Sequence, residues 1–223
     1  PSNIRRWLLE SDLVDAIIAL PTDMFYNTGI ATYFWVLDNA KPQERVGKVQ
    51  LIDATGFYTK MRKSLGSKRR EISDDQRDEI VKLYGEYVEG EHSKIFRTDE
   101  FGYWTITVER PLIDDDGNVV TDKKGNPKPD PKLRDTENVP FTYGGNTAGE
   151  AGAKATITKY MLEEVLPHVS DAWVDDKKTK VGYEIPFTRH FYKYVPPRLL
   201  AEIDADLEAQ VAKILNLLRE VEA

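Results

Sequence analysis

Three short apolar runs near the start of the chain predict three β-strands. Val14–Leu20 is short and mainly apolar, which is typical of a strand buried on both faces of a sheet, and Pro21 ends it. Ile30–Leu37 predicts a second buried strand and Lys48–Ala54 a third. The connection between the second and third runs is shorter than the roughly dozen residues of a parallel crossover. We therefore expect the third strand to be the antiparallel hairpin partner of the second.

Two helices are indicated on either side of these strands. Residues 3–11 have helical spacing, with Ser2 or Asn3 as N-cap. Ser73-Asp-Asp-Gln76 has the form of a capping box and starts a helix that extends to Tyr87. The side chains expected to face the core are Ile4, Trp7, Leu8 and Leu9 in the first helix and Ile80, Val81, Leu83 and Tyr84 in the second.

The second half alternates between strand, loop and helix patterns. Lys94–Phe96 and Tyr103–Glu109 predict two short strands around a turn at residues 99–102. Asp114–Pro131 is rich in Gly, Pro and Asp and predicts an exposed hairpin or mobile loop. A helix is expected over Thr156–Leu166, before Pro167, and a last helix from about Pro197 onward.

The last helix carries a heptad pattern, since apolar residues follow alternating steps of three and four with one polar interruption. A stripe this narrow needs another helix to cover it. That helix could lie within the chain, but the C-terminal position favours another subunit. The stripe consists of Leu200, Ile203, Leu207, Gln210, Ile214, Leu217 and Val221.

Composition restricts the kinds of site that the chain can form. The 223 residues are 40% hydrophobic and 31% charged, which is typical of a globular protein. Cysteine is absent, so disulfides, thiolate metal sites and cysteine nucleophiles are excluded, and a reducing cytoplasm is the expected location. No apolar run is long enough for a membrane helix and no signal peptide pattern is present. Residue 1 is Pro rather than Met, which agrees with an internal start.

A net charge of −7 means that any contact with nucleic acid must come from local basic patches. One stretch of eleven residues carries six basic residues and no acidic one. It either neutralises phosphates or is a solvated helix face balanced by Glu71, Asp74 and Asp75. Its basic residues are Lys60, Arg62, Lys63, Lys68, Arg69 and Arg70.

Other candidate sites are weak. The histidines His92, His168 and His190 lack ligand spacing, so we expect no metal site. The Asp-rich cluster before Gly117 fails as a calcium loop, because Leu112 and Lys123 would occupy positions that need oxygen ligands. An aromatic run indicates core packing of the C-terminal region against the last helix. It contains Tyr183, Phe187, His190, Phe191, Tyr192 and Tyr194.

Several segments resemble one family, the modification (M) subunits of type I restriction-modification systems, which are adenine-N6 DNA methyltransferases. The matching segments are Asp15–Lys41, Lys60–Arg70, Ser93–Phe96, Phe101–Pro111 and Gly182–Arg198. The match is poor over about 113–161, where the segments 114–132 and 142–153 depart from the family. The Asn-Pro-Pro-aromatic motif and the glycine-rich S-adenosylmethionine loop are absent, so the chain looks like the C-terminal part of a longer protein.

The resemblance implies an α/β fold: the C-terminal edge of a Rossmann-like class I methyltransferase sheet, followed by a mainly helical C-terminal region. We expect four parts: residues 1–55 at the edge of the catalytic domain, 56–112 with a basic linker, helix and short strands, 113–155 as a loop-rich insertion, and 156–223 for assembly. S-adenosylmethionine would be the cofactor of the parent enzyme and would not bind this chain alone.

The resemblance also assigns roles to residues. The Pro21–Gly29 loop would supply part of the target-base pocket, with Phe25 stacking on the extruded adenine and Tyr26 and Asn27 beside it. From the residues alone, both aromatic side chains could equally pack the loop onto the sheet edge. The basic stretch would contact DNA phosphates, and the last helix would dock on the specificity (S) subunit, with a restriction (R) subunit as a further partner. The alternative is a non-catalytic interaction module that bridges subunits and DNA.

Overall fold

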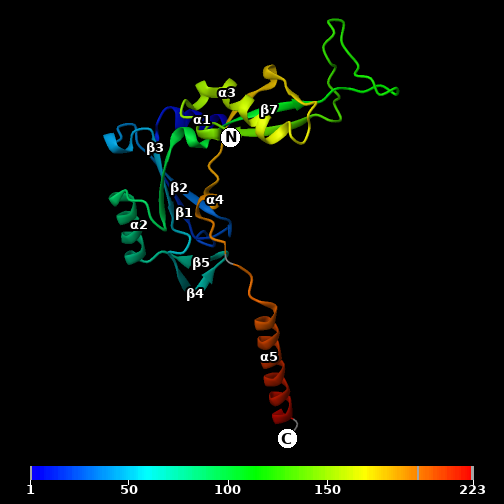
Figure 1. Cartoon of the computed structure of the whole chain (residues 1–223). Coiled ribbons are helices and arrows are strands. Elements are labelled where there is room, and N and C mark those ends of the chain that lie inside the picture. Colours follow the sequence, from blue (N-terminus) through cyan, green and yellow to red (C-terminus); the bar gives the residue numbers. More distant parts are fainter. Residues whose placement is uncertain (1, 195, 222–223) are drawn as a thin grey trace. The chain divides into compact units, whose positions relative to one another are not determined.

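The computed structural model describes residues 2–194 and 196–221. The chain divides into two compact units, Pro1–Phe191 and Tyr192–Ala223. The predicted α/β class is confirmed, since the described part of the first unit contains two four-stranded sheets and a two-stranded hairpin together with helices (Figure 1). The helices are α1 (Ser2–Glu10), α2 (Asp74–Glu86), α3 (Ala153–Tyr160), α4 (Phe187–Phe191) and α5 (Leu200–Val221). The strands are β1 (Val14–Leu20), β2 (Thr32–Leu37), β3 (Lys48–Asp53), β4 (Thr59–Leu65), β5 (Lys68–Glu71), β6 (Ser93–Arg97), β7 (Gly102–Glu109), β8 (Asp135–Pro140), β9 (Trp173–Val174) and β10 (Lys180–Tyr183).

The first sheet has the order β2-β1-β3-β6. β1 and β3 are parallel and form the buried centre, whereas β2 and β6 are antiparallel to their neighbours. Ile18 and Ile52 face α2 on one side of the sheet, and Ile17 and Leu51 join the main core on the other. β1 is therefore covered on both faces, as its apolar sequence predicts.

Two expectations for this sheet were wrong. β3 does not pair with β2 but with β1, because β1 lies between them. The short connection still explains the directions, since β2 ends and β3 begins at the same end of the sheet and the two run oppositely. β2 is also not buried: Tyr33, Phe34 and Leu37 are 43%, 58% and 55% exposed on this edge strand.

A buried ion pair fastens α2 to the first sheet. Arg45 donates to the Asp15 carboxylate at 3.0 Å and to the carbonyl of Tyr84 at 2.5 Å. The Tyr84 hydroxyl donates to the same carboxylate at 2.6 Å. Burial and this bond to Asp15 raise the pKa of Tyr84 to about 12. The predicted capping box is confirmed, since Gln76 and Ser73 exchange hydrogen bonds at the start of α2.

Both expected helix faces are only partly correct. In α1 the buried side contains Leu9, with Leu8 partly covered, while Ile4 and Trp7 are 66% and 60% exposed. In α2 Ile80 is buried, whereas Val81, one step of about 100° further round the helix, is 60% exposed. Each helix therefore carries more apolar residues than the rest of the described chain buries.

The second sheet has the order β10-β7-β8, with β9 also on β7, so that β6 and β7 belong to different sheets. Its centre is Trp104, packed on Phe141 with ring centroids 4.4 Å apart. At the end of β7 the buried Glu109 accepts from Arg134 and Lys178. Burial alone would raise the Glu109 pKa, but these two hydrogen bonds outweigh it and hold the pKa below its usual value.

The remaining predicted elements are confirmed in outline. The helix over Thr156–Leu166 forms as α3 and continues as a π-helical turn, Met161–Val165. The glycine-rich 142–153 stretch forms two 3-10 turns, Tyr143–Gly145 and Gly149–Gly152. Residues 112–134 project beyond the end of β7 as an exposed arm of tight turns (Figure 1). α5, in the second unit, is a single helix.

Candidate functional site

The aromatic loop Pro21–Gly29 follows β1 directly and turns back on itself. Asp23 adopts a left-handed φ of 60°, and a β-bridge joins Phe25 to Thr28. Phe25 and Tyr26 are 46% and 64% exposed at the tip, and Asn27 is exposed beside them. Packing onto the sheet edge therefore does not fully bury these two rings.

The basic stretch forms a β-hairpin, not a helix face, so the solvated-helix alternative was wrong. Gly66 and Ser67 make a two-residue turn between β4 and β5, and Gly66 has the left-handed φ of +59° that such turns favour. This turn reverses the chain and places Leu65 opposite Lys68, so the basic stretch forms a hairpin rather than a helix.

The aromatic loop and the basic hairpin are bound to each other through backbone hydrogen bonds. The amide of Ser67 donates to the carbonyl of Tyr26 at 2.9 Å, and the amides of Arg69 and Arg70 donate to the carbonyl of Asp23 at 2.9 and 3.2 Å. The two stretches that the sequence singles out separately are thus one structure. We call it the loop–hairpin site, comprising Pro21–Gly29 and Thr59–Glu71.

The six basic residues of the hairpin are not equivalent. Arg70 is half-buried: its guanidinium lies 4.0 Å from the Tyr58 ring centroid and donates to the Thr22 hydroxyl at 3.0 Å. Arg70 therefore helps to hold the site together. The other five make no recorded ion pair within the described ranges. They are Lys60, Arg62, Lys63, Lys68 and Arg69.

A hollow of about 460 Å³ lies between the loop and the hairpin. Its lining includes the side chains of Asp23, Lys60, Arg69 and Arg70, so it is polar and carries more positive than negative charge. Cationic side chains beside exposed aromatic rings are the combination that binds the phosphates and the bases of a nucleic acid.

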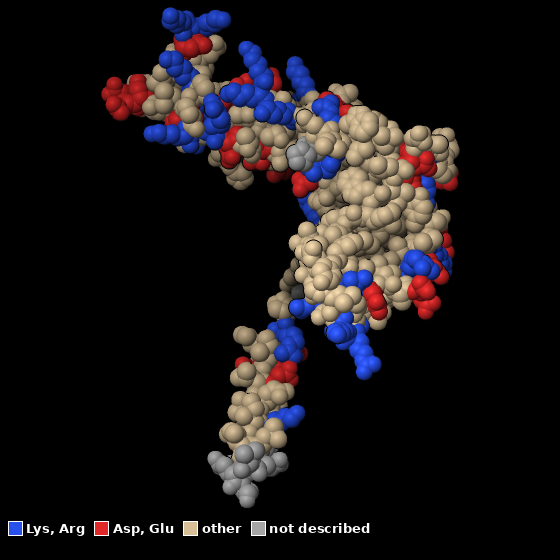
Figure 2. Space-filling model, turned by 180° about the vertical axis from the view of Figure 1, so that it is seen from behind, with Lys and Arg blue, Asp and Glu red and all other residues tan. Residues whose placement is uncertain are grey.

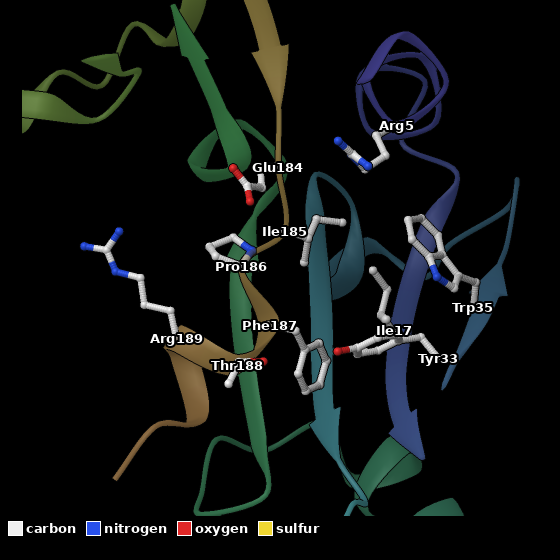
Figure 3. A pocket seen from close by; sticks show the side chains of 10 residues that line it. All are labelled: Arg5, Ile17, Tyr33, Trp35, Glu184, Ile185, Pro186, Phe187, Thr188 and Arg189. Carbon is white, nitrogen blue, oxygen red and sulfur yellow. The ribbon is translucent and has the colours of Figure 1, made fainter. Parts of the chain in front are cut away.

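A second hollow, of about 530 Å³, lies between β1, β2 and the segment after β10 (Figure 3). It is mainly apolar, and the tilted rings of Tyr33 and Phe187 lie in its wall with their centroids 5.3 Å apart. Arg5 in its wall already donates to the carbonyl of Tyr183 at 2.9 Å. This hollow depends on where the segment 184–189 lies against β1 and β2, which no local sequence pattern indicates.

The other candidate residues are dispersed. Tyr183, Phe187 and Phe191 pack on the main core, as expected of core residues, and the His190 ring contacts Phe96 in a tilted arrangement, with ring centroids 4.2 Å apart. Tyr192 and Tyr194 are instead 69% and 71% exposed. The described residues contain no cluster of His, Asp and Glu suited to a metal ion. None of the described helices is both long and apolar enough to cross a bilayer.

The heptad stripe is exposed along α5. Leu207 and Ile214 are 64% and 55% exposed, and the side chain of Val221 lies outside the described residues. A second apolar row, which the predicted heptad stripe does not include, consists of Val211, Leu215 and Leu218, which are 48–55% exposed. The apolar surface is therefore wider than a two-stranded seam requires.

Comparison with known proteins identifies the family. The family model described as N-6 DNA Methylase matches residues 1–119. The type I restriction enzyme MjaVIII methylase subunit of Methanocaldococcus jannaschii is 33% identical over 84 residues, which are 38% of this chain and 14% of that protein. The MjaIX methylase subunit of the same organism is 28% identical over 119 residues, 53% of this chain and 20% of that protein.

A solved methyltransferase subunit of a type I restriction-modification system from Streptococcus thermophilus is 24% identical, with a TM-score of 0.38, and the match covers 44% of this chain and 19% of that one. The chain thus spans no more than about a fifth of these relatives. The family model and the two methylase subunits of Methanocaldococcus jannaschii confirm the resemblance to type I methylase subunits that the sequence motifs indicate. Because the family model covers more than half of its residues, the chain belongs to the N-6 DNA methylase family.

Proposed function

We propose that this chain is the C-terminal part of a type I modification subunit, whose parent enzyme transfers a methyl group from S-adenosylmethionine to adenine N6 in DNA. The observation that carries the proposal is the set of backbone hydrogen bonds that unite the aromatic loop with the basic hairpin. An enzyme that acts on a base in a duplex must extrude that base and hold the distorted backbone. One site with exposed rings and cations serves both needs.

Within this site Phe25 stacks on the extruded adenine, and Tyr26 and Asn27 form the adjoining wall. The exposure of Phe25 and Tyr26 supports this role, since a ring at the loop tip is free to receive a base. Lys60, Arg62, Lys63, Lys68 and Arg69 contact phosphates. Arg70 adds to the positive electrostatic potential of the site, although its guanidinium already contacts the Tyr58 ring and the Thr22 hydroxyl.

The described residues do not fit S-adenosylmethionine. The parallel strands β1 and β3 are followed by Pro21 and by Ala54, and neither end leads through a glycine-rich turn into a helix. We therefore propose that this chain alone neither binds the cofactor nor methylates DNA. Calorimetric titration tests this, and stoichiometric binding at micromolar affinity would refute the proposed division of labour.

The edge strand β2 supports a Rossmann-like sheet that extends beyond this chain. One side of β2 pairs with β1, and the described residues place no strand on its other side. Exposed apolar side chains on an unpaired edge favour pairing with a further strand. In the proposed parent enzyme, the cofactor-binding strands continue the sheet from this edge.

α5 favours a second role, in assembly. Its exposed apolar rows need a helical partner, and we propose the specificity subunit as that partner, with the contact formed by the heptad stripe. A restriction subunit would join the same complex. A purely non-catalytic module that bridges subunits and DNA would use this helix but would not need an exposed Phe25.

The experiment uses the complete modification subunit with its specificity subunit. Phe25→Ala is expected to reduce methylation of duplex DNA by about five-fold to 150-fold, because stacking of a base on an aromatic ring is worth about 1–3 kcal/mol. Cofactor affinity should not change, and Phe25→Trp should be milder. Trp7→Ala, which removes another exposed ring, is the control. Unchanged methylation by a folded Phe25→Ala enzyme would reject the stacking role and leave the interaction module as the better reading.

A further inference from the structure

The exposed arm of residues 112–134 is built from three copies of one turn. Asp114, Asp122 and Asp130 recur every eighth residue. In each copy the Asp carboxylate accepts the amide hydrogen of the residue two positions later, at distances of 2.7–3.1 Å. In each copy the Asp carbonyl accepts the amide of the residue three positions later, at 3.1 Å. The arm is therefore a repeated, ordered structure.

The three turns are joined at their base by a ring of hydrogen bonds. The Leu112 amide donates to the Lys128 carbonyl at 2.8 Å, the Lys128 amide to the Val120 carbonyl at 2.8 Å, and the Val120 amide to the Leu112 carbonyl at 2.9 Å. Gly117 and Gly125 supply the left-handed residues, with φ of 85° and 82°. This ring gives each turn a defined direction from the arm.

Charge is divided between the turns. The first turn exposes Asp115 and Asp116, whereas the second exposes Lys123 and Lys124. The carboxylate of Asp122 accepts the amides of Lys124 and Asn126, which orients it toward the backbone of the turn, and it offsets only one of the two lysine charges. Figure 2 shows lysine and arginine side chains gathered at one tip of the projecting arm and acidic side chains at another.

We propose that the second turn of this arm, with Lys123 and Lys124 at its tip, binds the phosphate backbone of duplex DNA. No ion pair is recorded for either lysine among the described residues, so both charges are available to a ligand. All side chains of residues 122–126 are polar or absent, which suits an anionic backbone rather than an apolar protein surface. Asp115 and Asp116 lie on a different turn and need not approach the same phosphates.

The proposal rests on the proposed function only in taking DNA as the ligand. It is tested with the full chain and a fluorescein-labelled duplex, by anisotropy at several salt concentrations. The double variant Lys123→Ala/Lys124→Ala should bind several-fold more weakly, and the slope of log K against log salt should fall in magnitude by about two. The control Lys177→Ala/Lys180→Ala removes the same charge from exposed positions outside the arm. It should change affinity by less than two-fold.

Two further variants separate the possible outcomes. Gly125→Val keeps both lysines but cannot easily adopt φ of 82°, so it should also weaken binding. Full affinity of Gly125→Val, or equal loss in the control pair, would overturn the proposal in favour of unspecific charge. Lys60→Gln/Arg69→Gln reports on the loop–hairpin site. If this variant weakens binding and the arm variant does not, only the arm proposal fails; if neither does, DNA is not the ligand.

Discussion

The amide of Ser67 donates a hydrogen bond to the carbonyl of Tyr26 at 2.9 Å, which fixes the turn of the basic hairpin to the tip of the aromatic loop. The neighbouring Gly66 leaves the space for this contact. A Cβ added at Gly66 would lie 2.8 Å from the Tyr26 carbonyl oxygen, closer than such atoms approach. The glycine thus permits the loop and the hairpin to meet.

Gly66→Ala is therefore expected to loosen the loop–hairpin site. The substitution combines a left-handed φ of +59° with the contact to Tyr26, which together cost about 1–3 kcal/mol. Hydrogen exchange should show faster exchange of the Ser67 and Arg69 amides and no change in β1 or β3. Gly56→Ala is the matched control, because no atom lies within 4 Å of its added Cβ. Equal protection of these amides in both variants would contradict the role given to Gly66.

The pattern of apolar residues predicted most elements of the fold but not how the strands are ordered. The apolar run of β1 and the capping box of α2 are local signals, and both were confirmed. The order β2-β1-β3 depends on which strand lies between the other two, and no local sequence pattern predicts that position. The apolar composition of β2 predicts a buried central strand, although several of its side chains are exposed at an edge.

The candidate site was predictable only in pieces. The composition of the aromatic loop and of the basic stretch indicates each of them as a candidate site. Their contact with each other depends on hydrogen bonds to the backbone carbonyls of Asp23 and Tyr26, which composition does not predict. Asp23 has a φ of 60°, a conformation that Asp adopts more often than most non-glycine residues but that its presence alone does not predict. The turn at Gly66-Ser67, in contrast, carries a readable signal, and it could have indicated a hairpin in place of a helix.

The basic hairpin should contribute to the salt dependence of DNA binding by the complete enzyme. Lys60→Gln/Arg69→Gln removes two unpaired charges that line the hollow, so the salt slope should fall in magnitude by about two while the fold keeps its stability. Arg70→Gln should differ, because it also loses the contacts with Tyr58 and Thr22 and should lower the free energy of unfolding by about 1 kcal/mol. Urea unfolding and anisotropy distinguish the two variants. A slope unchanged by the double substitution would exclude phosphate contact at this hairpin.

His190 should make stability depend on pH. Burial against Phe96, followed by the positive charges of Lys94 and Arg189, lowers the pKa of His190, and the opposing effect of Glu100 is smaller. The unfolded chain, with a His pKa of about 6.5, then binds the proton more readily than the folded chain. Stability is fully retained above that pH and declines as the pH falls through it towards the folded-state pKa, by at most about 1.4 kcal/mol per pH unit.

The measurement compares urea unfolding at about pH 7.5 and pH 5.5. His190→Leu should reduce the difference between the two free energies of unfolding, whereas His168→Gln, at an exposed position, should leave it unchanged. An identical pH dependence in the His190→Leu protein would show that its imidazole is not the group responsible.

α5 should mediate association with the specificity subunit without supporting the sheets. The helix belongs to a separate compact unit, so its removal leaves the contacts of residues 1–191 in place. Deletion of residues 207–223 is therefore expected to abolish co-elution with the specificity subunit on size exclusion while the thermal unfolding of the first unit is unchanged.

Leu207→Asp and Ile214→Asp should act in the same direction, because each would bury a charge in an apolar contact. Glu208→Ala, which adds no charge to the stripe, should still bind. If the truncated protein co-elutes with its partner, the contact must be sought elsewhere, beginning with the exposed rings of Tyr192 and Tyr194.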